Sequence, residues 1–150
     1  MNWTIERGKI NDAECLAHFQ LQMAKESEGT ILHLPTVLNG VLSVLKDEVK
    51  GTYLVAKSNS GEIVGSLLLT KEWSDWNCAW YWWIQSVFVK SEFRRQGVYT
   101  CMYKKVKELA KENHISAVRL YVDKNNSRAK ASYQKLGMNE SHYLLYEEEL

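Results

Sequence analysis

The segment SVFVKSEFRRQGVYT, residues 86–100, decides how this chain folds and where it can bind a ligand. Residues 86–89 have the apolar and β-branched character of a buried strand. A short loop with Arg94, Arg95 and Gly97 follows, and a helix is predicted to begin directly after the glycine. A helix start presents N–H groups that lack intrahelical acceptors and the positive end of the helix dipole, and a glycine lets a ligand approach the backbone. The segment therefore predicts a cradle for a diphosphate.

Two common phosphate-binding motifs do not describe this loop. The Walker A pattern G-x-x-x-x-G-K-[ST] is missing from the sequence. The loop also has one glycine, where the dinucleotide-binding fingerprint G-x-G-x-x-G has three. The cradle must therefore be formed mainly by backbone N–H groups at the helix start.

Length and composition limit the class of protein. A chain of 150 residues with 45% hydrophobic and 25% charged residues predicts one globular domain over residues 1–150. A net charge of +1 offers no basic field for nucleic acid or an anionic membrane. The sequence has no apolar run long enough to span a bilayer, and its first residues do not resemble a signal peptide, so a cytoplasmic location is expected. Three dispersed cysteines and four dispersed histidines predict free thiols and no metal site.

The order of predicted elements indicates an α/β (α+β) fold, with a mixed central sheet and about four helices. Asn11 and Glu14 have the spacing of a capping box at the start of the first helix, and Pro35 suits the first turn of the second. The predicted strands cover residues 2–9, 52–57, 62–71, 79–90, 117–122 and 142–147. The predicted helices cover residues 12–26, a segment from Pro35 onward, 98–112 and a segment between Asn126 and Gly137.

A second motif follows the strand predicted at residues 117–122. It has the form N-x-x-A-x-x-x-Y-x-x-x-G-M and consists of Asn126, Ala129, Tyr133, Gly137 and Met138. With the loop at residues 94–99, it resembles the GNAT superfamily of acyl-CoA-dependent N-acetyltransferases, whose coenzyme loop has the form [Q/R]-x-x-G-x-[G/A]. The loop of this chain matches at Arg94 and Gly97. It departs at Tyr99, where the family usually has a small residue.

The resemblance implies that acetyl-CoA is the co-substrate, that a primary amine accepts the acetyl group in a ternary complex, and that a homodimer is possible. Backbone groups of Val87, Phe88 and Val89 would bind the pantetheine arm and polarise the thioester carbonyl. Asn126 would contact the coenzyme arm, and Tyr133 would lie near the sulfur. The diphosphate would be held by the loop and the helix start, at Arg94, Arg95, Gln96, Gly97, Val98, Tyr99 and Thr100.

The implied reaction requires a proton donor and a proton acceptor. A tyrosine O–H such as that of Tyr133 can protonate a departing thiolate. Many family members have a glutamate base on the strand before the coenzyme loop, but this chain has Gln85, which cannot accept the proton. Glu72 or Asp75 is the alternative base, directly or through water, and Gln85 would orient the water or the acceptor.

Each candidate also has a purely structural interpretation. Arg94 and Arg95 could be a solvated pair, Tyr133 a core side chain and Asn126 only a helix cap. Glu72 and Asp75 could be surface charges. A cluster of tryptophans could fill the core and cover a hairpin, or it could form an aromatic wall around an amine acceptor. The cluster consists of Trp73, Trp76, Trp80, Trp82 and Trp83.

Two functions compete with acetyl transfer. The departures at Gln85 and Tyr99 would suit a catalytically inactive, acyl-CoA-binding or regulatory module. The tryptophan-rich surface would suit a protein-interaction domain that binds no coenzyme. Binding of coenzyme A separates the protein-interaction domain from the two functions that use the coenzyme. Turnover separates an active acetyltransferase from the inactive module.

Overall fold

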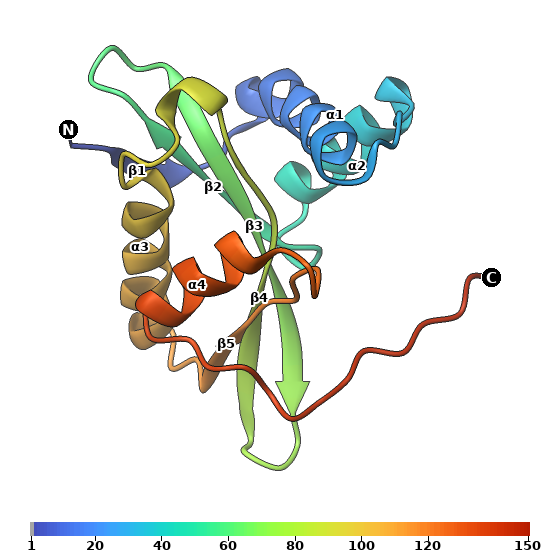
Figure 1. Ribbon diagram of the computed structural model, residues 1–150, viewed down its shortest axis with the longest axis vertical. Coiled ribbons are helices and arrows are strands. Elements are labelled where there is room, and N and C mark those ends of the chain that lie inside the picture. Colours follow the sequence, from blue (N-terminus) through green and yellow to red (C-terminus); the bar gives the residue numbers. More distant parts are fainter. Residues whose placement is uncertain (1) are drawn as a thin grey trace. The chain divides into compact units, whose positions relative to one another are not determined.

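The computed structural model describes residues 2–150 (Figure 1). The chain forms two compact units, a first unit that ends at Leu120 and a second unit from Tyr121 to Leu150. The single-domain organisation stays a prediction. The described residues contain four α-helices and a mixed five-stranded sheet, which confirms the predicted fold class.

The sheet lies entirely in the first unit. Its strands are hydrogen-bonded in the order β1-β2-β3-β4-β5, which is also their order along the chain. β1, β2, β3 and β4 pair antiparallel in that order, and β5 pairs parallel with β4. The strands are β1 Thr4–Arg7, β2 Thr52–Lys57, β3 Ile63–Ser74, β4 Ala79–Val89 and β5 Ala117–Arg119.

Local signals set most helix boundaries. Pro35 lies in the first turn of α2, as predicted, and Gly97 precedes the first residue of α3 with a φ of 81°. The predicted capping box at Asn11 and Glu14 is wrong, because a 3-10 turn at Ile10–Asp12 comes first and the Asp12 side chain accepts the N–H of Lys9. The helices are α1 Ala13–Glu28, α2 Leu34–Lys46, α3 Val98–Glu112 and, in the second unit, α4 Ser127–Lys135.

Helices cover both faces of the sheet in the first unit (Figure 1). α1 and α2 bury Leu16 and Val41 against Tyr53, Val55 and Leu68. α3 covers the opposite face with side chains that are nearly or fully inaccessible to solvent. The side chains of this second layer are Val98, Met102 and Val106, opposite Leu54, Leu67 and Leu69.

A β-bulge interrupts the pairing of β3 with β4. Ser66 is opposite Phe88, but Leu68 is opposite Gln85, so two residues of β4 face Leu67 alone. Ser86, one of these two residues, has a φ of 52°. Such bulges bend a strand and redirect the groups beside them.

The outer edge of β4 is open beside the bulge. β5 pairs with β4 only at Tyr81–Trp83. Within the first unit, residues 84–89 of β4 thus have a strand partner on the β3 side alone. An extended ligand could add to this edge as a further strand would.

Three predicted strand boundaries need correction. The third strand of the chain continues to Ser74, so Glu72 lies in a strand. The strand predicted at residues 117–122 ends at Arg119, and residues 142–147 form no strand within the described chain. A strand needs a hydrogen-bonded neighbour, and alternation of side chains does not provide one. Leu144 and Tyr146 accordingly expose 73% and 89% of their surface.

Replacing Leu67 by alanine should lower the free energy of unfolding by about 2–5 kcal/mol, because Leu67 is fully buried between β2, β4 and α3. Urea unfolding followed by circular dichroism measures this change. Val49→Ala is the control, since Val49 exposes 86% of its surface and its truncation should change stability by less than about 0.5 kcal/mol. Equal effects of the two substitutions would contradict the assignment of the core.

Candidate active site

The loop between β4 and α3 is held by Trp3, the residue that precedes β1. The loop consists of a 3-10 turn at Ser91–Phe93 followed by residues 94–97. The Trp3 indole Nε1 donates to the carbonyl oxygen of Gln96 at 3.0 Å, and the Trp3 ring meets Phe93 edge-on at 5.8 Å. Trp3 is buried. Two contacts of Trp3 thus restrain the loop.

The start of α3 has the geometry of an anion site. The N–H of Cys101 donates to the carbonyl oxygen of Gly97 and closes the first helical turn. The N–H groups of residues 98–100 lie in the first turn of α3, and the N–H groups of a first turn have no acceptor within the helix. Arg95 and Gly97 have φ values of 61° and 81°, so the chain turns sharply into the helix. This arrangement is suited to bind a diphosphate.

Tyr99 occupies the position where the coenzyme motif usually has a small residue. Its ring stacks on Tyr103, one turn later in α3, with a centroid separation of 6.1 Å. The ring therefore lies along the helix, and its bulk is accommodated there.

Arg94 braces the loop. Its Nε donates to the carbonyl oxygen of Val89 at 2.8 Å, and its Nη2 pairs with Glu26 of α1 at 2.7 Å. The guanidinium also lies 5.7 Å from the centroid of Phe88, whose ring packs on Phe19. These bonds connect the end of β4, the loop and α1. They also lower the pKa of Glu26, chiefly through the hydrogen bond from Arg94.

The predicted pantetheine contacts lie on the open edge of β4. Phe88 is buried, and Val87 and Val89 are half-buried. All three follow the bulge at Ser86 and precede the loop. One continuous path of backbone thus runs from the bulge to the start of α3.

Gln85 lies immediately before the bulge. Its register partner is Leu68, which packs against α1 and α2, so Gln85 is on the same face of the sheet as those helices. Its Nε2 donates to the Thr70 hydroxyl oxygen at 2.7 Å. The amide is therefore oriented by the neighbouring strand.

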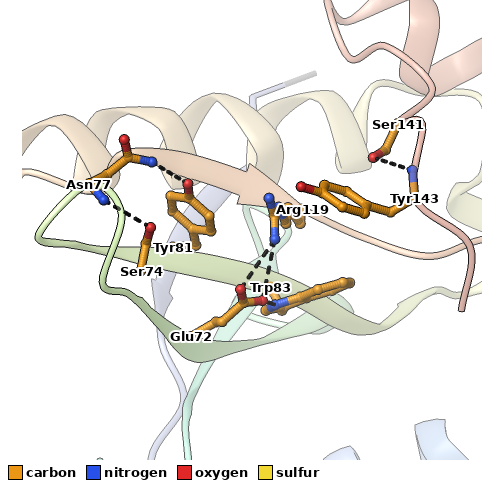
Figure 2. Close-up of polar contacts among 8 residues, drawn as sticks. All are labelled: Glu72, Ser74, Asn77, Tyr81, Trp83, Arg119, Ser141 and Tyr143. Carbon is orange, nitrogen blue, oxygen red and sulfur yellow. Dashed lines mark hydrogen bonds and ion pairs between the residues drawn. The ribbon is translucent and has the colours of Figure 1, made fainter.

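Further along the same face is a polar cluster, drawn in Figure 2. The Glu72 carboxylate accepts a hydrogen bond from Trp83 Nε1 at 2.8 Å and pairs with Arg119 at 3.2 Å. The Arg119 guanidinium lies 4.4 Å from the centroid of the Tyr81 ring. Glu72 therefore connects β3 with both β4 and β5.

Strand geometry separates the two predicted bases from Gln85. Glu72 is level with Tyr81, four residues before Gln85, which corresponds to about 13 Å along the strand. Asp75 lies in the turn before Ala79, about 20 Å from Gln85 by the same measure. The structure brings Gln85 and Thr70 together at the bulge and leaves both acids further along the hairpin.

Most of the tryptophan cluster lies away from Gln85. Trp73 and Trp80 form an edge-to-face pair at 5.0 Å, and Lys71 lies over the Trp80 ring. By strand alternation these residues and Trp82 are on the face opposite to Gln85. Trp76, 88% exposed, is in the turn. Only Trp83 shares the face of Gln85.

The second unit contains the second motif. The Asn126 side chain caps α4 by accepting the N–H of Ala129 at 3.1 Å, which confirms its predicted capping role. Tyr133 is half-buried in α4, and burial raises the pKa of its phenol. Gly137 follows the helix with a φ of 98°. The phenol of Tyr133 thus keeps its proton at neutral pH.

Sequence reasoning missed Trp3, Thr70 and Arg119. Each makes its contact with a residue distant in the sequence, so no local pattern pointed to it. Among residues 2–150, no three His, Cys, Asp or Glu side chains are grouped so that they could hold a metal ion. No helix in this range has the length and apolar character needed to cross a membrane.

The four helices and the mixed five-stranded sheet of the described residues form an α/β fold like that of GNAT acetyltransferases. The model of the acetyltransferase (GNAT) family matches residues 21–138, and the chain belongs to this family. No protein with curated annotation matches the sequence.

Solved structures share the fold over nearly the whole chain. A possible acetyltransferase from Clostridium difficile 630 is 38% identical, with a TM-score of 0.91 and coverage of 100% of this chain and 99% of that one. A transcriptional regulator from Bacillus halodurans C-125 is 25% identical, with a TM-score of 0.83 and coverage of 98% and 99%. A probable acetyltransferase at 19% identity has a TM-score of 0.88 and coverage of 98% and 97%, and shows the fold alone.

Replacing Glu26 by glutamine should reduce the free energy of unfolding at pH 7 by less than about 1 kcal/mol, because the pair with Arg94 is partly exposed. The pKa of Glu26 is lowered from its ordinary 4.5, so the pair stabilises the fold above that value. The difference from wild type should vanish in acid, below the lowered pKa. Urea titrations across the pH range measure it, with Glu28→Gln as the control. A difference that persists in acid would contradict an electrostatic role.

Proposed function

We propose that this protein transfers the acetyl group of acetyl-CoA to a primary amine, by direct attack in a ternary complex. The observation that carries the proposal is the continuous backbone path from the bulge at Ser86 to the start of α3. An acyl-CoA has a matching order of groups, with a thioester, an amide-containing arm and a diphosphate. Family membership supports the same assignment.

Backbone groups of β4 and α3 would hold the coenzyme. Val87, Phe88 and Val89 would pair with the amides of the pantetheine arm, as a neighbouring strand would. The N–H groups between Arg95 and Thr100 would bind the diphosphate, whose charge suits the positive end of α3. Arg94 would act mainly as the brace of this loop, since both Val89 and Glu26 bind its guanidinium. Asn126 would add a contact to the arm.

The chemical step needs stabilisation of one oxygen and protonation of one sulfur. A backbone N–H at Val87 or Phe88 would donate to the thioester oxygen as negative charge develops on it. Tyr133 would protonate the departing thiolate, and its raised pKa supports a phenol that retains this proton until the step occurs. Close approach of the two substrates would supply much of the rate.

The acceptor would lie over the face that carries Gln85 and Trp83. Gln85 would orient the amine, and the ring of Trp83 would border it. The sequence-based proposal of Glu72 or Asp75 as the base loses support, because both acids lie further along the hairpin than Gln85 and the Glu72 carboxylate is bound to Trp83. A cytoplasmic location and a homodimer are part of the same proposal.

Gly97 provides the first test. Calorimetry should detect binding of coenzyme A, and mixing acetyl-CoA with a panel of amines should release thiol. Gly97→Val should weaken coenzyme binding about 10-fold or more, because a β-branched residue is strained at a φ of 81° and would change the backbone turn that leads into α3.

Gly61→Val is the matched control, since Gly61 has a φ of 85° in the β2–β3 turn and is equally open around its Cα. It should cost similar stability and leave coenzyme affinity unchanged. Tight coenzyme binding without turnover on any amine would support the inactive module, and no binding at all would refute the proposal.

Tyr133→Phe should lower turnover on the order of 100-fold and leave coenzyme affinity nearly unchanged, because the substitution removes the proton donor and keeps the ring. Thiol release under saturating acetyl-CoA measures the first quantity, and calorimetry the second. Tyr146→Phe is the control, since Tyr146 is 89% exposed. Wild-type turnover of Tyr133→Phe would refute the acid role.

A further inference from the structure

We propose that the acceptor is a weakly basic primary amine, such as an α-amino group, which binds in its neutral form with an N–H on the side-chain oxygen of Gln85. This inference rests on the proposed function and adds the chemical class of the acceptor. It follows from the groups that the first unit gathers around the bulge and from their order along the sheet.

Gln85 is the polar side chain next to the reacting position. The bulge begins one residue later, at Ser86, and β4 has its open outer edge from there to Val89. If the thioester arm adds to this edge, its carbonyl lies close to the bulge. An amine that attacks from the α1 and α2 face then meets the side chain of Gln85, which is on that face.

The hydrogen bond to Thr70 decides which end of the amide faces the acceptor. Gln85 Nε2 donates to Thr70 Oγ1 at 2.7 Å, so Oε1 is the atom left to receive an acceptor N–H. An amide oxygen accepts a hydrogen bond but does not take up a proton near neutral pH. Gln85 can therefore orient the nitrogen lone pair without deprotonating an ammonium group.

In the first unit, the ionisable side chains nearest to Gln85 form hydrogen bonds and ion pairs with other residues. On the same sheet face, Glu72 is bound to Trp83 and Arg119, and Arg119 lies over Tyr81. These side chains belong to strand positions at least two residues from Gln85. On α1, Glu26 is paired with Arg94.

The remaining charged groups of α1 and the following connection point to solvent or to local partners. His18 contacts the carbonyl oxygen of Glu14, and His33 contacts the Thr36 hydroxyl. Glu14, Lys25 and Glu28 are exposed. Loss of the ammonium proton to water before binding is then the simplest route to a nucleophile.

This route selects acceptors by their own basicity. An α-amino group with a pKa near 8 is about 10% neutral at pH 7, whereas a lysine side chain with a pKa near 10.4 is about 0.04% neutral. The neutral, nucleophilic fraction thus differs between the two amines on the order of 200-fold. An enzyme that has no proton acceptor beside the substrate nitrogen favours the less basic amine, by a large part of this factor.

The transfer balances without an external base. The nitrogen lone pair forms the N–C bond to the acetyl carbonyl carbon, and the C–S bond breaks with its electron pair on sulfur. The neutral amine begins with two hydrogens and ends as an amide with one. The nitrogen loses one proton and the sulfur gains one, so the overall transfer neither consumes nor releases a proton.

The test is the pH dependence of kcat/KM for amines of similar shape and different basicity. Fluorination lowers the pKa of a simple alkylamine with little change in size. The pH of half-maximal kcat/KM should follow the pKa of each amine along such a series. A common midpoint for all amines would reveal an enzyme base in either unit and overturn the proposal.

A peptide pair identifies the source of the amine. One lysine-containing peptide has a free α-amino group and a blocked side chain, and the other has the reverse. At pH 7 the first should be acetylated on the order of 100-fold faster, and an equal rate would overturn the proposal. An aromatic amine that reacts while both peptides fail would retain the weakly basic class and exclude the α-amino source. Absence of thiol release with every amine would refute the proposed function itself.

Gln85→Glu supplies a base at the same position. The variant should accelerate acetylation of the lysine side-chain amine at pH 7 and lower the midpoint of its profile, while Gln85→Leu should slow all acceptors. Glu72→Gln and Asp75→Asn should leave the wild-type midpoints in place. A shift of the midpoint in either of these two variants would identify that acid as the base and overturn the proposal.

Discussion

Ser86 has a left-handed backbone conformation because two residues of β4 must face Leu67 alone. That extra residue bends β4 at the point where β5 has ceased to pair with it. Within the first unit, the strand therefore ends with one edge bonded to β3 and the other without a strand partner. The open backbone at Val87 to Val89, which begins the proposed coenzyme path, follows from this local loss of pairing.

The open edge is useful only if the loop after it keeps its shape. Trp3 and Arg94 provide that restraint from two sides, one through the carbonyl oxygen of Gln96 and the other through Val89 and Glu26. An arginine in a phosphate-binding motif is easily assigned to the phosphate. Here its guanidinium is bound within the protein, and the proposed anion site would consist of backbone N–H groups that need no side-chain charge.

The β3–β4 hairpin has two chemically different faces. One carries two separate groups of hydrogen bonds, one between Gln85 and Thr70 and the other from Trp83 and from Arg119 on β5 to Glu72. The other carries the paired rings of Trp73 and Trp80. Alternation along the strands separates the two sets, so a tryptophan-rich sequence places just one indole, that of Trp83, beside the proposed acceptor position.

Sequence alone determined the features whose cause is local. β2 at Thr52–Lys57, Pro35 in the first turn of α2, the start of α3 after Gly97 and the cap at Asn126 all depend on residues a few positions apart. Only the tertiary structure decided that Glu72 binds Arg119, 47 residues away, and that residues 142–147 form no strand. Strand register and cross-strand neighbours depend on how distant segments pair, and a single sequence has no local signal for that pairing.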